Sequence, residues 1–214
     1  MDNVTTKNNI GTEAIDFLAD FNDSLLRLAL NDGILKEIPL IKSAVTLCKL
    51  AQDIPNYFFL RNLNVFLKTA DTLDEQEFAK AKEKFSNYED KEKLGENILY
   101  ILTHSEDNQK VKILAKALTL LNQDDIDVPF YLTFCFHIVN CCSNDLKYIL
   151  YFKEQNSIIT SINPNIPEET LNSLFSNSFL YDCGFDGGDL SGTYGGTKFG
   201  LSKYGDILKK ILSE

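Results

Sequence analysis

The chain has 214 residues, of which 44% are hydrophobic and 11% aromatic, as expected of a globular protein that buries a core. Its 31 acidic residues outnumber its 21 Lys and Arg, and the net charge of -10 disfavours broad binding to phosphate backbones. The most apolar windows, residues 44–50 and 130–139, are interrupted by Lys, Asp or Pro before the roughly 18 residues that a membrane span needs. We therefore expect no transmembrane helix.

Cysteine usage predicts a reducing compartment. The cysteines are odd in number, lie mostly in apolar helical contexts and show no framework spacing (Cys48, Cys135, Cys141, Cys142 and Cys183). The first residues contain no charged segment followed by an apolar one, so we expect no secretory signal. These features predict a cytoplasmic protein.

The first half of the chain is predicted to be helical after a polar, disordered segment over residues 1–11. Apolar residues recur at helical spacing, and Pro39 and Pro55 suit the first turns of two helices. Residues Thr72–Glu75 form a capping box, in which Ser or Thr is followed three residues later by Glu or Gln. Helices are therefore predicted over residues 12–33, 39–52, 56–69 and 72–85.

The next segments continue the helical pattern. Asp127 is a suitable N-cap, with Pro129 inside the first turn of the helix that follows. Helices are predicted over residues 89–103, 107–121, 127–142, 144–154 and 167–177. The polar and β-branched residues 156–165 are predicted to form a loop.

The glycine distribution changes sharply near the C-terminus. Eight of the eleven glycines fall between Gly184 and Gly205, and glycine is favoured where φ is positive or backbones approach closely. We expect a β-hairpin built from residues 179–183 and 194–201, followed by a helix that Ser202 caps and that ends at Leu212. The predicted fold class is mainly α, a multi-helical bundle (12–155) with a small hairpin end-piece (166–214).

The order helix, strand, glycine-rich turn, strand and helix in the end-piece resembles the end of a winged-helix unit. The matching residues are Leu180-x-x-x-Gly184, Tyr194 and Phe199-x-Leu201-Ser202-x-x-Gly205-x-x-Leu208. This resemblance implies nucleic-acid contact through the wing and the helix before it. The acidic residues of the wing, Asp182, Asp186 and Asp189, oppose docking on phosphates, so we expect nucleic acid not to be the partner.

Three features stand out within residues 38–150: Gly95-Glu96, the helix break at Ser105-Glu106-Asp107 and Lys112-x-x-x-Lys116. Through these features the stretch resembles a set of uncharacterised bacterial proteins with a tellurite-resistance-type (TerB-like) helical body. The metal-binding acidic pattern of that family is absent from this sequence, so no ligand is transferred. The resemblance implies a bacterial accessory protein of the stress-response or phage-defence type that works through interactions.

One cluster of potential soft metal ligands occurs in the sequence, at Cys135, His137 and Cys141. His137 and Cys141 are four residues apart and share a helix face, which suits two ligands of one ion. A closed zinc site needs further ligands, and no CxxC pair supplies them. We interpret the segment as a core helix rich in thiols and expect no cofactor and no catalytic residue.

Aromatic residues are the best candidates for contacts with a partner or a second copy of the chain. Two helical segments hold more aromatic residues than one narrow helix stripe can bury, and the hairpin adds more. The candidates are Tyr57, Phe58, Phe59, Tyr148, Tyr151, Phe152, Phe185 and Tyr194.

Three functional hypotheses follow. The first is a non-enzymatic helical protein that acts through protein–protein contacts, because the sequence shows a full core signature and no catalytic set. The second is a winged-helix regulator that binds nucleic acid, and the third is a metal-dependent enzyme. No small-molecule substrate is identified.

Overall fold

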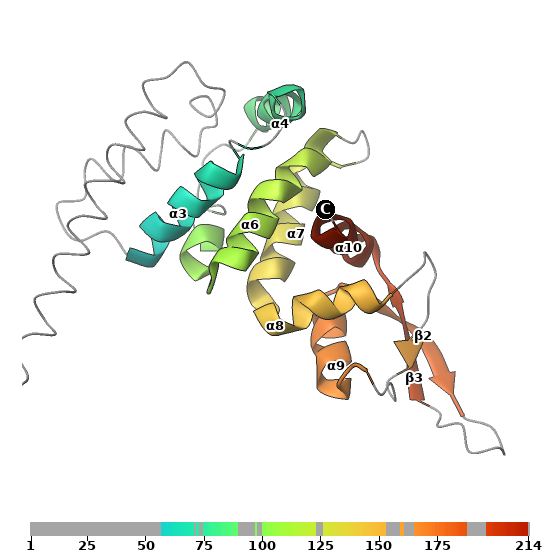
Figure 1. Cartoon of the computed structure of the whole chain (residues 1–214). Coiled ribbons are helices and arrows are strands. Elements are labelled where there is room, and N and C mark those ends of the chain that lie inside the picture. The colour runs from blue at the N-terminus through green and yellow to red at the C-terminus, as the bar shows by residue number, and fades with distance from the viewer. Residues whose placement is uncertain are drawn as a thin grey trace, which may run out of the picture.

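A computed structural model of the chain describes residues 57–70, 72, 75–89, 97, 100–122, 126–152, 159–160, 165–187 and 196–213. The predicted disordered N-terminus and the helices predicted over 12–33 and 39–52 lie outside the described residues. In the described part, helices form the body, and a small antiparallel sheet lies near the C-terminus (Figure 1). This arrangement confirms the predicted fold class.

Two helices open the described part. Helix α3 spans Tyr57–Ala70 and helix α4 spans Glu75–Asn87, within two or three residues of the predicted bounds. Leu63, Phe66 and Ala70 follow one another at spacings of three and four on α3, and all three are buried. Ala81 and Phe85 hold the equivalent positions on α4.

Asn62 on α3 is a fully buried polar residue with every hydrogen-bonding group in use. Its side-chain nitrogen donates to the carbonyl oxygens of Leu102, at 2.7 Å, and Ser105, at 2.8 Å. Its side-chain oxygen accepts from both Nε and Nη2 of Arg61, at 3.2 and 3.0 Å. The two carbonyls lie at the C-terminal end of the helical segment 100–104, where helical partners are lacking. Asn62 therefore joins α3 to this helix end.

The central helices begin at the caps that the sequence predicts. Helix α6 spans Asn108–Lys116 and helix α7 spans Val128–Asn140. Asp107 accepts a hydrogen bond from the backbone N–H of Lys110, and Asp127 accepts one from that of Phe130. The helix predicted to continue to residue 121 tightens after Lys116 into a 3₁₀ helix, η2, at Ala117–Asn122.

Lys110 is the second fully buried polar residue that ties helices together. Its Nζ donates to the carbonyl oxygen of Val139, at 2.8 Å, and to Glu106 Oε2, at 3.3 Å. Val139 lies in the last turn of α7, whose carbonyls have no helical partner. The buried ammonium group thus caps α7. Its ion pair with Glu106 offsets part of the free-energy cost of burying a charge.

The segment predicted as one helix over 144–154 is shorter and changes its pitch. Helix α8 spans Ser143–Leu146 and continues as a 3₁₀ helix, η3, at Lys147–Tyr151. Residues 159 and 160, in the segment predicted as a loop, form a short strand, β1 (Ile159–Thr160). Both of these residues are β-branched, which suits a strand.

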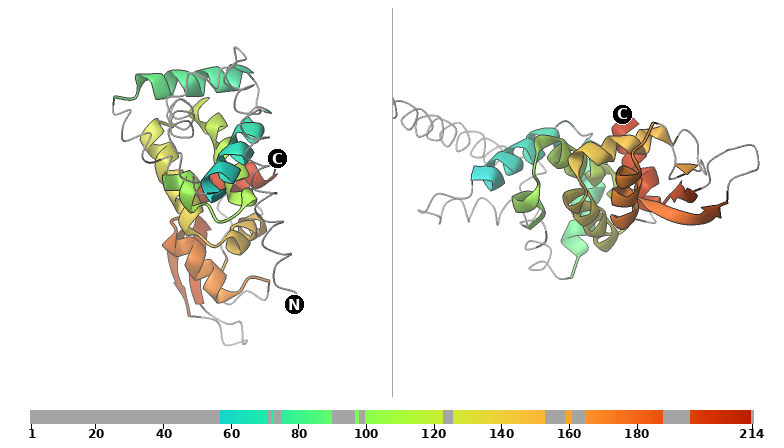
Figure 2. Two further views of the ribbon diagram at one scale, coloured as in Figure 1. Left: turned by 90° about the vertical axis from the view of Figure 1, so that its left-hand side faces the viewer. Right: turned by 90° about the horizontal axis from the view of Figure 1, so that it is seen from below.

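The end-piece contains helix α9 (Glu168–Ser176), strands β2 (Leu180–Asp186) and β3 (Gly196–Leu201), and helix α10 (Lys203–Ser213). The strands form an antiparallel sheet in the order β1-β3-β2, with Leu180 opposite Leu201 and Ile159 opposite Phe199. Figures 1 and 2 show that α3 and the hairpin lie at opposite ends of the described structure.

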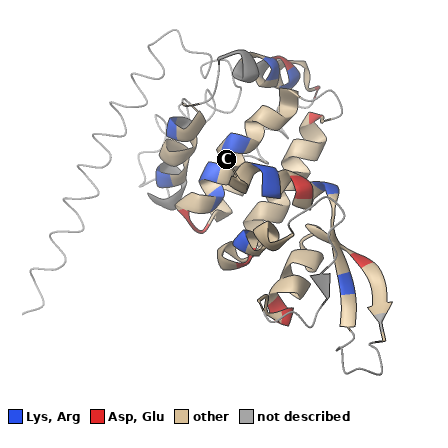
Figure 3. Cartoon of the chain, turned by 45° about the vertical axis from the view of Figure 1, so that its right-hand side comes forward, with Lys and Arg blue, Asp and Glu red and all other residues tan. Residues whose placement is uncertain are grey.

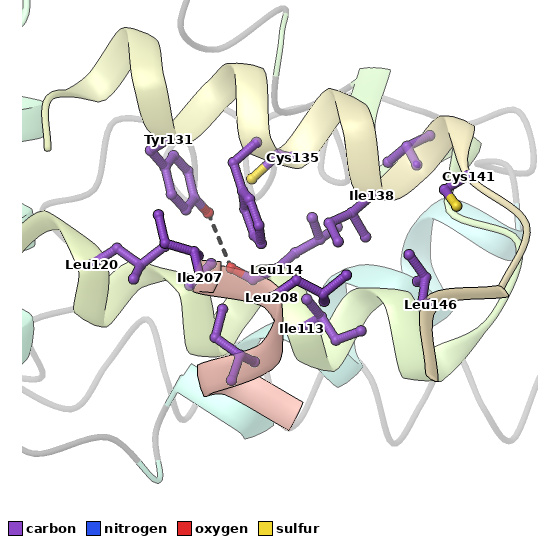
Figure 4. Packing of buried hydrophobic residues seen from close by; sticks show 14 of the residues in the cluster. Ile113, Leu114, Leu120, Tyr131, Cys135, Ile138, Cys141, Leu146, Ile207 and Leu208 are labelled. Carbon is purple, nitrogen blue, oxygen red and sulfur yellow. Dashed lines mark hydrogen bonds between the residues drawn. The ribbon is translucent and has the colours of Figure 1, made fainter. Parts of the chain in front are cut away.

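The buried apolar residues form one cluster that runs from α3 to α10. Helix α10 buries Ile207, Leu208 and Ile211 and contacts η3 and α6 of the body as well as β3. Figure 4 shows Ile207 and Leu208 of α10 among buried side chains of α6 and α7. The predicted division into body and end-piece stays a prediction, but the two parts share a core. Among the described helices, none has the length and apolar character needed to cross a bilayer.

The turn after α9 fixes the start of β2. Ser178 has a φ of 63°, and the amides of Ser178 and Phe179 donate to the carbonyls of Phe175 and Leu174. These two bonds form a Schellman motif, with Ser in the left-handed position that usually holds Gly. Buried Phe179 then leads into the strand.

The first turn of α10 docks directly on this turn. The Ser202 amide donates to the carbonyl of Phe179, at 3.0 Å, and its hydroxyl donates to the carbonyl of Ser178, at 2.5 Å. The same hydroxyl accepts from the Gly205 amide, at 3.1 Å, which makes Ser202 the cap that the sequence predicts. A Cβ on Gly205 would lie 2.1 Å from the Phe179 carbonyl oxygen, so only glycine fits here.

Replacement of Gly205 by Ala should destabilise the fold by about 2–3 kcal/mol or more. Ala favours a helix by about 1 kcal/mol over Gly, but the clash with backbone exceeds that gain. Chemical denaturation measures the change. A Cβ on Gly187 meets nothing within 4 Å, so Gly187→Ala is the matched control and should stay within about 0.5 kcal/mol. Equal stability of the two variants would contradict the close approach.

Replacement of Asn62 by Ala should cost about 2–3 kcal/mol, because two buried carbonyls then lose their donor. Asn140→Ala is the control, since exposed Asn140 also donates to a helix carbonyl, that of Phe136 at 2.8 Å, yet water can replace it. Urea unfolding should separate the two variants by at least about 1 kcal/mol. A neutral Asn62→Ala substitution would show that Asn62 does not join these helices.

Candidate interaction surface

Large aromatic side chains are exposed on the end-piece. Phe175 near the end of α9 is 43% exposed, Tyr181 on β2 is 46% exposed, and Phe185 farther along β2 is 77% exposed. Phe185 has the highest exposure among the large apolar residues of the described part. Exposed aromatic side chains that lie close together are typical of contact surfaces.

The strand register places Phe175 and Phe185 on the same side of the sheet. Asp182 pairs with Phe199 and, after a bulge, Phe185 pairs with Thr197, so Phe185 shares a sheet face with Phe199. The rings of Phe175 and Phe199 are 5.6 Å apart between centroids, so α9 covers this face. Phe199 itself is buried. We call Phe175, Asp182, Phe185 and Phe199 the α9-side face.

The opposite side of the sheet has a different character. Tyr181 pairs with Gly200, and a Cβ on Gly200 would lie 2.6 Å from Cζ of the Tyr181 ring. The ring therefore lies across the glycine, and an alanine there would push it away. Lys198 is two residues before Gly200 on β3 and shares this opposite face.

The charges on α9 and β2 are all negative. Glu168 and Glu169 are exposed in the first turn of α9, and Asp182 is exposed on β2. Neither α9 nor β2 contains Lys or Arg, whereas β3 contains a basic residue (Figure 3). This residue is Lys198, which the register places on the other face. The carboxylate of Asp182 accepts a hydrogen bond from the Gly184 amide, at 2.6 Å, which holds it in place.

A second aromatic surface lies on η3. The rings of Tyr148 and Tyr151 stack with centroids 5.7 Å apart, and Leu150 beside them is 43% exposed. A 3₁₀ helix has three residues per turn, so Tyr148 and Tyr151 lie on one side and Ile149 and Phe152 on another. Phe152 is fully buried, so its prediction as a surface contact is wrong.

The other predicted contact residues fall partly outside the described structure. Tyr57, Phe58 and Phe59 lie in the first turn of α3, but their side chains are not among those described. Tyr194 lies outside the described residues. Sequence reasoning missed Phe175 and Tyr181. The alternation of β2 could have placed Tyr181 on an outer face, but the exposure of Phe175 depends on how α9 packs.

The residues considered as soft metal ligands have separate surroundings. Cys135 is buried beside Tyr131, whose hydroxyl donates to the Leu114 carbonyl at 3.2 Å (Figure 4). Burial raises the pKa of the Cys135 thiol to about 12, which disfavours the thiolate form that a nucleophile or a metal ligand needs at neutral pH. Burial likewise raises the pKa of Cys141, to about 11, and its Sγ lies 3.9 Å from Ser173 Oγ.

His137 lies between two aromatic rings. Its ring centroid is 4.8 Å from that of Tyr204 on α10 and 6.2 Å from that of Phe179. Tyr204 in turn stacks on Phe130, 4.7 Å away, so these rings join α7 to α10. Across the part of the chain that the structure describes, no group of three or more His, Cys, Asp or Glu side chains is placed to hold a metal ion.

Comparison with known proteins finds no matching family model and no significant match among curated proteins or solved structures. The function must therefore be inferred from the geometry of this chain.

The stability of the protein should fall as the pH is lowered from about 7 towards 5.5 because of His137. Burial lowers its pKa in the folded state below 6.5, so the unfolded state takes up a proton first. Stability from neutral His137 is present above pH 6.5 and is lost as the pH falls towards the folded pKa. His137→Gln should flatten this part of the curve of unfolding free energy against pH. An NMR titration that gives His137 a pKa above 6.5 would contradict the expectation.

Proposed function

We propose that the chain is a non-enzymatic protein that acts by binding another protein through the α9-side face. The single observation that supports this most is Phe185 on β2, which at 77% has the highest exposure among the large apolar side chains of the described part. Burying a Phe side chain on association contributes about 2–3 kcal/mol, so an exposed one is a strong potential contact. The described cysteines are free thiols, which suits action in the reducing cytoplasm.

The geometry around Phe185 supports a pre-formed contact surface. Phe185 pairs with Thr197, two residues from buried Phe199 on the same face of β3, and Phe175 packs on Phe199 from α9. Part of the face is therefore fixed by packing. A contact on a rigid base loses little conformational entropy on binding. Partners that bind here would bury apolar rings at the centre and meet polar groups at the rim, as is usual in interfaces.

A winged-helix regulator that binds nucleic acid is the second candidate. The strand order β1-β3-β2, with α9 leading into β2 and α10 following β3, favours it. The charges on α9 disfavour nucleic-acid binding, since Glu168 and Glu169 are exposed and no Lys or Arg lies on this helix. Lys and Arg side chains supply most of the affinity for phosphate backbones.

Phe185→Ser should abolish capture of a partner while leaving the free energy of unfolding within about 0.5 kcal/mol, because the side chain is exposed. The test is a tagged pull-down from cells of the source organism, quantified by mass spectrometry for wild type and variant. Leu150→Ser on η3 is the control, since it removes an apolar residue that is 43% exposed outside the α9-side face and should retain the partner.

Two outcomes would contradict the proposed function. One is the absence of any protein enriched by wild type over Phe185→Ser. The other is salt-sensitive binding of a labelled DNA or RNA duplex at low ionic strength that Lys198→Glu weakens, which would favour the second candidate.

A further inference from the structure

The α9-side face carries apolar and negative groups on one side of the sheet. Asp182 pairs directly with Phe199, so its carboxylate shares a face with that ring and lies one cross-strand spacing from it. Phe185 follows on the same side of the same strand, 77% exposed. A partner that covers the Phe185 ring therefore also meets the Asp182 carboxylate.

This carboxylate has no cation beside it on the elements that form the face. Helix α9 and strand β2 contain no Lys or Arg, and among their described side chains the exposed charged ones are those of Glu168, Glu169 and Asp182. Lys198 on β3 faces the other side of the sheet. Covering Asp182 with an apolar or acidic surface would remove water from a charge without replacing it, which costs free energy.

A second copy of this chain fits the face poorly for the same reason. In a symmetric contact the same patch occurs on both subunits, so the two Asp182 carboxylates would share one interface. Neither α9 nor β2 of the second copy would supply a Lys or Arg to pair with them. Like charges in a desolvated interface oppose association.

We propose that the partner of the α9-side face is a protein segment that presents Lys or Arg beside apolar side chains. This inference rests on the proposed function and specifies the chemistry of its partner. The apolar side chains cover the rings of Phe175 and Phe185, and the cation pairs with Asp182. A Lys or Arg can also lie over the face of the Phe185 ring, which adds a cation–π contact.

Labelled peptides of about 12 residues test the proposal with the full-length protein and fluorescence anisotropy. One set alternates Leu or Phe with Lys, a second has Glu in place of Lys, and a third has Ser in place of Leu and Phe. The first set should bind at least about tenfold more tightly than the other two, a difference of about 1.4 kcal/mol. Its affinity should fall as salt is added.

Variants then locate the contact. Phe185→Ser and Asp182→Asn should each weaken binding of the first set at least about fivefold, a loss that corresponds to about 1 kcal/mol. Asp182→Asn keeps the side-chain oxygen that accepts from the Gly184 amide, so it removes charge and preserves the bend of β2. Leu150→Ser should bind as wild type does. Equal binding of the Glu set, no effect of Asp182→Asn, or no binding by any set would overturn the proposal.

A crosslinking experiment separates this inference from the proposed function. p-Benzoylphenylalanine in place of Phe185 is activated by light in cells, and the crosslinked segment is mapped by mass spectrometry. A mapped segment with net positive charge and apolar residues supports the inference. An acidic or neutral segment, or a second copy of the chain, overturns it and leaves a protein contact at Phe185 standing. No crosslinked protein at all means that the proposed function itself is wrong.

Discussion

The contact between the first turn of α10 and Phe179, the residue before β2, is the constraint on which the C-terminal part depends. Two hydrogen bonds from Ser202 and the close approach of Gly205 to the Phe179 carbonyl hold the two ends of the hairpin together. The chain can then return from β3 into α10, whose buried side chains join the core of the body. The position of the hairpin relative to the helices is thus determined by backbone contacts at its base. An aromatic residue placed farther along β2 is held away from the body, where it stays accessible.

A few buried polar residues bind to helix ends and so join the helices of the body to one another. Asn62 satisfies carbonyls at the end of the helical segment 100–104, and Lys110 does so at the end of α7. Both reach across from another helix, so each couples two elements distant in sequence. Apolar packing is tolerant of small shifts, whereas a hydrogen bond to a buried carbonyl has a fixed geometry. These contacts therefore select one arrangement of the helices among those that bury the same area.

Elements that depend on local signals could be predicted from the sequence, and those that depend on tertiary contacts could not. Caps at Asp127 and Ser202 lie where expected because a cap needs only its own turn. Strand β1 was missed, because a two-residue strand exists only where β3 offers it a partner. At the candidate site Phe185 was predicted, since it lies in a glycine-rich hairpin with little to cover it. Phe152 was wrongly predicted as a surface contact, because the sequence does not show that its helix becomes a 3₁₀ helix. With three residues per turn, Phe152 lies on the same side as buried Ile149.

The bulge in β2 has a consequence for the way this protein can associate. Strand β2 lies at the border of the described sheet, and such strands can recruit extended chains through their free amides and carbonyls. The irregular register between Asp182 and Phe185, with Gly184 at a φ of 97°, interrupts that row of backbone groups, and Asp182 already occupies the Gly184 amide. The bulge therefore disfavours the pairing of another chain along this part of β2. The side chain of Phe185, and not the backbone of its strand, is then the group that the hairpin offers for association.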